Sequence, residues 1–214
     1  MSSRSPTDGD SRPRSGSGDA ELDARLDALC AEGWALWEHF DRTVREADFH
    51  PFVAADYAVV REALLELRAP GRRFLEWGSA SGIVAIMADL MGYDACGIEI
   101  DASLVRTARD IARRHRSDAR FVVGSFLPTG YRWRTEEGEQ PMGTIDEGPS
   151  GYLALGRALD EFDIVFGYPW GGEAPLMRDV MQRYGRSDAL LLLFDASGAL
   201  HRYVGGRDGA DAVG

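Results

Sequence analysis

Apolar side chains recur along the chain with a helical period first and a strand-like pattern later. Over residues 22–44, large apolar residues return every three to five positions, which predicts an amphipathic helix. Gly33 interrupts this stripe, so we expect the helix to be weak or split there. A second helix is expected after Pro51, with Asp56 as its N-cap. Together they predict an N-terminal helical extension, and a lid over a bound ligand, at residues 19–69.

After residue 70, short apolar runs alternate with amphipathic segments. The runs predict strands at Arg73–Trp77, Asp94–Ile100, Arg120–Gly124, Asp163–Gly167, Ala189–Phe194 and Leu200–Val204. The segments between them predict helices at Ser81–Met91, Ser103–Arg116, Tyr152–Leu159 and around Leu176–Tyr184. This alternation is typical of a parallel sheet with helices on both faces. We therefore expect an α/β fold, a three-layer α/β/α domain over residues 70–206, with ligands at the carboxyl ends of its strands.

Three other segments carry little apolar pattern. Residues 1–18 are rich in Ser, Gly, Pro and Arg and predict a disordered tail. Residues 127–150 predict a long loop insertion, and residues 207–214 predict a flexible C-terminus. Because only about 20 residues follow the fifth strand, we expect a shortened C-terminal sheet edge, or one completed by a partner chain.

Composition narrows the possible functions. The chain of 214 residues has 24 arginines, no lysine, 35 acidic residues and a formal net charge of −11. Without lysine, Schiff-base chemistry and a P-loop lysine are excluded. The acidic balance argues against broad binding to nucleic acid or anionic membranes, although a local basic patch is compatible with it.

The cysteines and the apolar runs bear on the compartment. Cys30 and Cys96 are far apart in apolar patterns, and the four histidines are scattered, so we expect neither disulfides nor a metal site. No apolar run approaches the roughly 20 residues of a membrane span. A cytoplasmic location is therefore expected.

The strongest motif is Glu76-Trp77-Gly78-Ser79-Ala80-Ser81-Gly82, between a predicted strand and a predicted helix. Small residues let backbone N–H groups approach a ligand closely, and a helix N-terminus favours negative charge. The spacing departs from the nicotinamide fingerprint G-x-G-x-x-G, because alanine and isoleucine replace its later glycines. Taken alone, the motif is also compatible with a tight turn that holds no ligand.

A second motif makes the ligand interpretation more specific. Glu99 ends the second predicted strand 21 residues after Gly78, where an acid accepts the ribose hydroxyls of a nucleoside. The Gly-rich loop and Gly97-Ile98-Glu99-Ile100 together resemble the class I S-adenosylmethionine-dependent methyltransferases, over roughly residues 72–195. This family has a Rossmann-like sheet, which agrees with the predicted architecture.

The resemblance implies roles for individual residues. The loop Gly78–Gly82 would hold the methionine part of S-adenosylmethionine, and Glu76 would orient the loop or meet the amino group through water. Glu99 would bind the ribose, while Ile100 and Phe126 would enclose the adenine. The implied reaction is methyl transfer to an oxygen or nitrogen nucleophile of a small molecule.

The chain also departs from the family pattern. Ser125 stands where an acid often contacts the adenine amino group, and Gly167 stands where an Asp or Asn often binds the target amine. Tyr168 and Trp170 are expected either to contact substrate or to pack at a strand end. Glu173 is expected to be either a general base or a first-turn acid favoured by the helix dipole.

The N-terminal helices add two substrate-contact candidates and an interface. Asp56 and Tyr57 either contact substrate as part of a lid or cap and pack a helix. A homodimer through these helices, or through the C-terminal sheet edge, is a further expectation. The expected partner is a small molecule, with neither nucleic acid nor membrane favoured.

Two alternative functions stay open at this point. A nicotinamide-dependent oxidoreductase is disfavoured by the loop spacing and by the absence of a lysine-containing catalytic pair. A non-catalytic nucleoside-binding or interaction protein is favoured by the replaced residues at Ser125 and Gly167.

Overall fold

A seven-stranded sheet forms the centre of the computed structural model, which describes residues 15–43, 55–133 and 148–208, with side chains from residue 18 onward. The sheet order is β3-β2-β1-β4-β5-β6-β7. The strands are β1 (Arg73–Trp77), β2 (Asp94–Glu99), β3 (Arg120–Val123), β4 (Ile164–Gly167), β5 (Leu190–Phe194), β6 (Leu200–Val204) and β7 (Arg207–Asp208). Strands β1 to β5 are parallel, whereas β6 and β7 run antiparallel to their neighbours.

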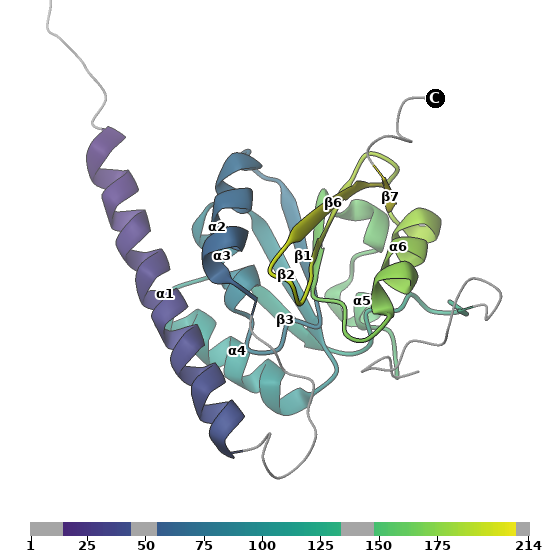
Figure 1. Ribbon diagram of the computed structural model, residues 1–214, viewed down its shortest axis with the longest axis horizontal. Helices are drawn as coiled ribbons and strands as arrows, with labels where there is room; N and C mark the ends of the chain where they lie inside the picture. Colours follow the sequence, from purple (N-terminus) through teal and green to yellow (C-terminus); the bar gives the residue numbers. More distant parts are fainter. Residues whose placement is uncertain (1–14, 44–54, 134–147, 209–214) are drawn as a thin grey trace, which may run out of the picture.

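Helices cover both faces of this sheet, as the alternating pattern predicted (Figure 1). They are α1 (Ser15–Thr43), α2 (Tyr57–Glu66), α3 (Ile83–Leu90), α4 (Ala102–His115), α5 (Gly151–Leu155), the 3₁₀ helix η2 (Leu159–Glu161) and α6 (Glu173–Tyr184). Helices α1 to α4 share one apolar core with the sheet, and α5, η2 and α6 share the other. The three-layer α/β/α prediction is confirmed, with α1 as an added outer helix.

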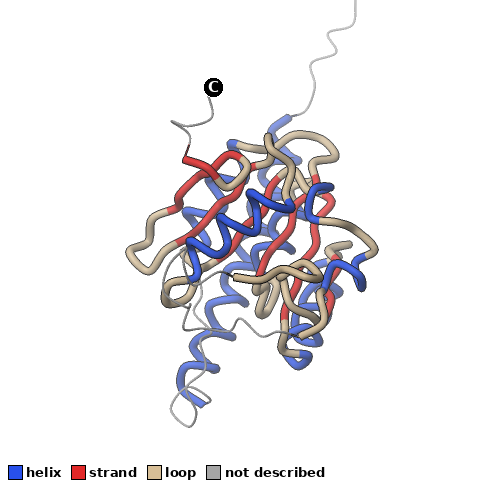
Figure 2. Tube along the Cα trace, turned by 90° about the vertical axis from the view of Figure 1, so that its right-hand side faces the viewer, coloured by secondary structure: helices blue, strands red, loops and turns tan. Residues whose placement is uncertain are grey.

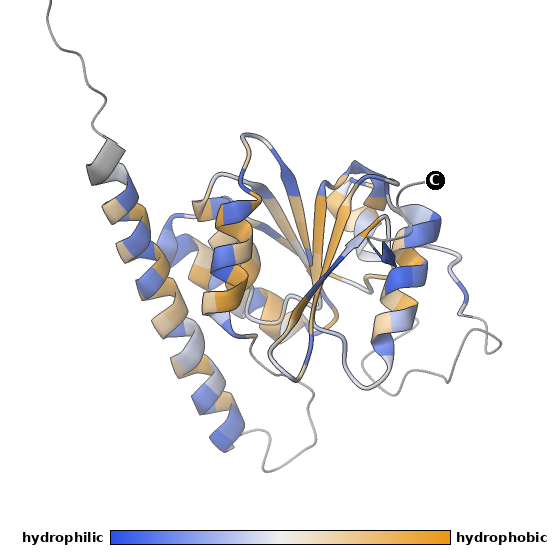
Figure 3. Cartoon of the chain, turned by 45° about the horizontal axis from the view of Figure 1, so that its top comes forward, coloured by the Kyte–Doolittle hydropathy of each residue, from blue (hydrophilic) through white to orange (hydrophobic). Residues whose placement is uncertain are grey.

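The central strands are apolar on both faces because both faces are covered. In β1, Phe74 points into the core beneath α3, and the adjacent Leu75 points into the core beneath α6; neither side chain is exposed. Figure 3 shows the central strands as hydrophobic, while polar residues gather on the outward sides of the helices. The parallel order brings the carboxyl ends of β1, β2 and β4 to one edge, which Figure 2 shows from the side.

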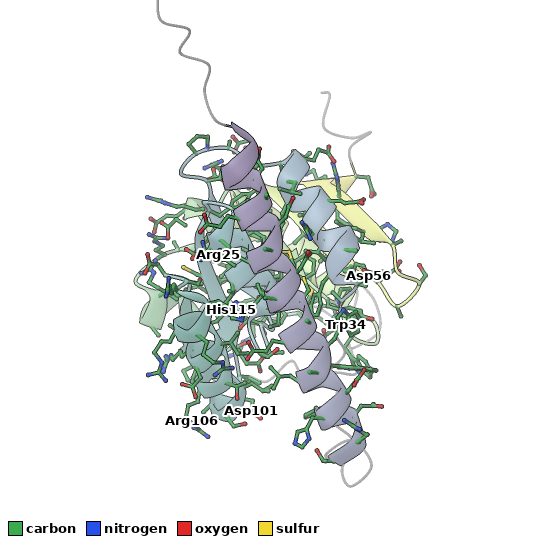
Figure 4. All side chains as sticks on the ribbon, turned by 90° about the vertical axis from the view of Figure 1, so that its left-hand side faces the viewer. Arg25, Trp34, Asp56, Asp101, Arg106 and His115 are labelled. Atoms are coloured by element: carbon green, nitrogen blue, oxygen red, sulfur yellow. The ribbon has the colours of Figure 1, made fainter. Side chains whose placement is uncertain are left out.

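Helix α1 is continuous, so the expected break at Gly33 is wrong. Gly33 is buried, and a Cβ there would lie 2.9 Å from both Ile83 and the ring of Tyr57. The glycine therefore allows a close approach of α1 to α2 and α3, and packing outweighs its low helix propensity. On the same helix the Trp34 ring packs against Tyr57 at a tilt of 58°, with ring centroids 5.1 Å apart; Figure 4 labels Trp34 beside α1.

Helix α1 also begins earlier than expected. Its first turns include residues 15–18, which the sequence predicted as the end of a disordered tail. The remainder of that tail lies outside the described residues. A helix that is held by packing further along extends cheaply by a turn, because propagation adds a hydrogen bond for each residue fixed.

Ion pairs attach the N-terminal helices to each other and to the sheet. Arg61 of α2 bonds to Asp23 and Asp27 of α1, at 2.6 and 2.7 Å. Arg202 of β6 makes a two-pronged contact with Glu66 of α2, at 2.8 and 2.6 Å. Because these groups are partly exposed, each pair contributes little free energy, and the buried apolar contacts carry most of the attachment.

The C-terminal edge contains one more strand than predicted. Arg207–Asp208 pairs with β6, so the first two residues of the expected flexible end are ordered. The turn uses Gly205 and Gly206, both with positive φ, and Arg178 and Gln182 of α6 donate to the Gly206 carbonyl. A two-residue strand has no hydropathy period, so tertiary contacts were needed to reveal it.

Among the described residues, no helix is long and apolar enough to span a bilayer.

The packing of Gly33 predicts opposite effects of one substitution at two places on α1. Gly33→Ala gains helix propensity but overpacks Tyr57 and Ile83, so we expect a net loss of about 1–2 kcal/mol of unfolding free energy. Gly18→Ala is the matched control, because a Cβ there meets nothing within 4 Å. It should raise stability by up to about 1 kcal/mol. Urea denaturation measures both, and equal effects would contradict the close approach at Gly33.

Candidate functional site

The turn between β1 and α3 has an unusual backbone. Gly78, Ala80 and Gly82 adopt positive φ angles of 62°, 44° and 76°. At Gly82, a Cβ would lie 2.6 Å from the Phe121 ring, so glycine is required for space as well as conformation. Ala80 adopts the left-handed region despite its side chain, at a cost of roughly 1–2 kcal/mol. The loop therefore holds a strained, defined shape at the carboxyl end of the sheet.

Glu99 holds this loop in place. One of its carboxylate oxygens accepts from the Ala80 N–H at 2.8 Å, and the other accepts from the Asp101 N–H at 3.0 Å. The side chain is only 8% exposed. A second tie is the Ser79 N–H, which donates to the Ile98 carbonyl at 3.0 Å. Charge-assisted hydrogen bonds of this kind are stronger than neutral ones, so Glu99 fixes the position of the strained residue.

Glu76 is a buried acid beneath the same loop. Its carboxyl accepts from the Ala85 N–H in the first turn of α3 at 2.9 Å. The pKa of Glu76 is raised to about 8, mainly because the carboxyl is buried; the Ala85 bond lowers the pKa, and the nearby charge of Glu99 raises it. Glu76 is therefore mainly protonated at neutral pH. A cation bound beside it would favour the ionised form.

A small cavity lies between the loop and the start of α2. Its volume is about 40 Å³. It is lined by Ala55, Tyr57, Glu76, Trp77, Gly78, Ser79, Ala80, Ser81, Ile83, Val84, Phe166 and Tyr168. The Ser79 side chain is 2% exposed, and its hydroxyl makes no hydrogen bond within the described residues. An unpaired buried hydroxyl is costly, which marks the cavity wall as prepared for a polar ligand atom.

Two tyrosines form the wall opposite the loop. Burial raises the pKa of Tyr57, and the charges of Glu76 and Cys30 add to the effect. Burial also raises the pKa of Tyr168, with a contribution from Asp195. Both phenols are therefore neutral hydrogen-bonding groups at physiological pH. Of the predicted substrate-contact residues, these are the two that the structure brings to the cavity.

Three predicted cofactor residues do not line this cavity. Ser125 is buried and joins the chain where it returns from the 127–150 segment, because its N–H donates to Pro149 and its carbonyl accepts from Gly151. Phe126 stacks on Trp77 with ring centroids 5.1 Å apart. Ile100 is half-buried at the end of β2. Residues 134–147 of the predicted loop lie outside the described part of the chain.

The other predicted residues have local structural contacts. The Asp56 carboxylate accepts from the Ala58 N–H at 2.9 Å, which confirms it as the N-cap of α2. Glu173 is buried at the start of α6 and accepts from the Trp170 N–H at 2.9 Å. Neither Glu173 nor Trp170 lines the cavity. This geometry favours the first-turn interpretation of Glu173.

Several lining residues were not singled out from the sequence. Phe166 lines the cavity near the end of β4. Ala55 lines it from the residues before α2, and Val84 lines it from the first turn of α3. Apolar residues at strand ends and in first helical turns look identical whether they pack or line a site, so hydropathy gives no signal here.

Within the described residues, no group of three or more metal-ligating side chains gathers in one place.

Part of the chain is similar in sequence to known methyltransferases. No family model matches the chain. It is 31% identical over 103 residues to the ribosomal protein L11 methyltransferase of Thermus thermophilus, a match that covers 45% of this chain and 41% of that protein. Over this segment the chain is similar to the ribosomal protein L11 methyltransferases. The first relatives are longer proteins, and the chain spans less than half of their length.

A second relative and a solved structure show similarity of the same partial kind. The ribosomal protein L11 methyltransferase of Paraburkholderia xenovorans is 39% identical over 62 residues, covering 28% of this chain and 21% of that protein. Among solved structures, an RNA methyltransferase from Salinibacter ruber in complex with S-adenosyl-L-homocysteine has a TM-score of 0.47 and 18% identity. That alignment covers 66% of this chain and 76% of the other.

The buried acid predicts a pH dependence of stability. Because folding raises the pKa of Glu76 above its unfolded value, the unfolded chain releases a proton that the folded chain keeps. Stability relative to Glu76→Gln should therefore be highest below about pH 4.5 and fall by a few kcal/mol as the pH rises to about 8. Urea denaturation at several pH values tests this. Parallel pH profiles for the two proteins would contradict a protonated Glu76.

Proposed function

We propose that the protein binds S-adenosylmethionine and transfers its methyl group to an oxygen or nitrogen nucleophile. The supporting observation is the loop Gly78–Gly82, which is fixed by Glu99, contains the buried and unpaired Ser79 hydroxyl and lines a cavity at the carboxyl end of the sheet. The partial similarity to ribosomal protein L11 methyltransferases supports the same conclusion.

The residues present fit the chemistry of this cofactor. Its methionine part carries a sulfonium, an ammonium and a carboxylate, so the site must combine acidic groups with polar donors. Glu76 supplies an acid that a cation would ionise, and Ser79 supplies a free hydroxyl. Glu99 uses its two oxygens for backbone bonds, yet a carboxylate has about four lone-pair positions, so two are left for ribose hydroxyls.

Cofactor binding requires movement of one cavity wall. The cavity of about 40 Å³ is far smaller than the roughly 300–1,000 Å³ of small-molecule sites. The loop is fixed by Glu99, whereas Tyr57 is the first residue of α2 and Ala55 lies just before its N-cap, Asp56. We therefore infer that this start of α2 yields when the methionine part enters.

The chain's own contribution to the reaction is alignment. S-adenosylmethionine supplies an electrophilic methyl group when it is bound. The loop and Glu99 would hold the nucleoside, while Ile100 and Phe126 would enclose its adenine. Tyr168 would meet the acceptor, because it lines the cavity from the end of β4. Its raised pKa makes it a better hydrogen-bond donor than base at neutral pH.

The acceptor we favour is a small molecule, because the net charge of −11 argues against broad binding to nucleic acid. Asp56 and Trp170 remain candidates for contact with it, since Asp56 lies between Ala55 and Tyr57 in the sequence and Trp170 lies two residues after Tyr168. Glu173 would act as a base only if it gave up its bond to the Trp170 N–H. Tyr168 is therefore the stronger of the two predicted catalytic candidates.

The unpaired hydroxyl predicts opposite changes in stability and binding. Ser79→Ala removes a buried group without a partner, so the free protein should gain about 1 kcal/mol of unfolding free energy. The same change should weaken S-adenosylmethionine binding about three- to tenfold. Ser197→Ala, in the β5–β6 turn, is the control and should leave binding unchanged. A loss of stability in Ser79→Ala would show that the hydroxyl already has a partner.

Calorimetry with three nucleotides tests the proposed function directly. We expect S-adenosylmethionine and S-adenosylhomocysteine to bind at micromolar concentration and NAD not to bind. Glu99→Gln keeps an acceptor for only one of the Ala80 and Asp101 N–H groups, places its NH2 against the other and loses the charge. It should therefore weaken both ligands by about tenfold or more and also lower the thermal stability. A preference for NAD, or no binding of the first two, would overturn the proposal.

A further inference from the structure

The arginines of this acidic chain are unevenly distributed. Six of the 24 fall within residues 106–120, which form most of α4 and the start of β3. Arg106, Arg109 and Arg113 are exposed and lie at positions i, i+3 and i+7 of the helix. These spacings put the three side chains on one face, with rises of about 4.5 and 6 Å between them.

A groove runs beside this row of arginines. Its volume is about 510 Å³. The three arginines line it, together with Asp110, Ala112, Ser117, Asp118 and Ala119. The lining contains no aromatic side chain and one large cationic row. Asp101 is the N-cap of α4. Figure 4 labels Arg106 close to Asp101, at the N-terminal end of this helix.

The guanidinium groups of this row keep donors available. Arg109 is held by two hydrogen bonds to the Phe121 carbonyl on the edge of the sheet, at 3.2 and 2.6 Å, so its charge is fixed but not neutralised. Arg113 contacts Asp110 through one of its nitrogens. Arg106 makes no ion pair within the described residues. By contrast, Arg61 divides its fork between two carboxylates.

We propose that this groove binds the phosphodiester backbone of a single-stranded nucleic acid. A row of cations suits a linear series of phosphates, and guanidinium groups bind phosphate oxygens in two-pronged contacts. Without aromatic side chains the groove offers no base stacking, so binding would not depend on base sequence. The proposal goes beyond the proposed methyl transfer and is independent of the acceptor.

The overall charge of −11 does not exclude such a site, because recognition depends on where charges lie. The groove has three arginines against Asp110 and Asp118. The excess is small, so binding should be weak and strongly sensitive to salt. Three phosphate contacts predict a slope of about −2 for log K against log salt.

Fluorescence anisotropy with a labelled 15-nucleotide polyuridylate RNA tests the groove at low and moderate salt. The variant Arg106→Gln/Arg113→Gln should lower affinity about tenfold or more. The matched control, Arg42→Gln/Arg68→Gln, removes two exposed arginines that do not line the groove and gives the same net charge. It should change affinity less than about twofold. Arg109 is left intact because it caps the sheet edge.

A gain-of-affinity variant completes the test. Asp110→Asn releases Arg113 and should strengthen RNA binding about two- to fivefold. Equal losses in the two double variants would show a general charge effect and overturn the proposal, as would no RNA binding at low salt. Thermal melts confirm that each variant is folded. Because these measurements use no methyl donor, their failure leaves the proposed methyltransferase function untouched.

Discussion

The carboxylate of Glu99 is the contact on which the candidate site depends. It joins the end of β2 to the strained residue Ala80 in the loop that follows β1, and it also receives the Asp101 N–H at the start of α4. The loop has three residues with positive φ, and one of them, Ala80, is not glycine, so its backbone conformation costs free energy. Without the contact to Glu99, the loop would adopt other conformations. The parallel register of β1 and β2 brings Glu99 beside the loop.

The N-terminal helices complete the site by close packing. Gly33 lets α1 approach the ring of Tyr57, and Trp34 covers that ring from the outside. Tyr57 in turn faces the cavity next to the loop. Substitutions on α1 therefore reach the cavity through one side chain, although α1 itself lines none of it. The partly exposed ion pairs between the helices add orientation more than stability.

Charge is organised on two scales in this protein. The total is strongly acidic, and the buried acids Glu76 and Glu99 bond to backbone N–H groups of the loop Gly78–Gly82 and of the start of α3. The row at Arg106, Arg109 and Arg113 concentrates positive charge on one helix face instead. A net charge sums these regions and so describes solubility and long-range attraction better than it describes any one surface.

The sequence by itself determined the α/β alternation, the position of the Gly-rich loop and the acid at the end of β2, because these depend on local periodicity and on spacing along the chain. Tertiary structure decided the rest. It kept α1 intact across Gly33, since packing against Tyr57 compensates for low helix propensity. It added β7, whose two residues carry no period, and it separated Ser125 from the cavity by bonding it to the returning chain. Such outcomes depend on contacts between segments that are distant in sequence, so local sequence patterns do not predict them.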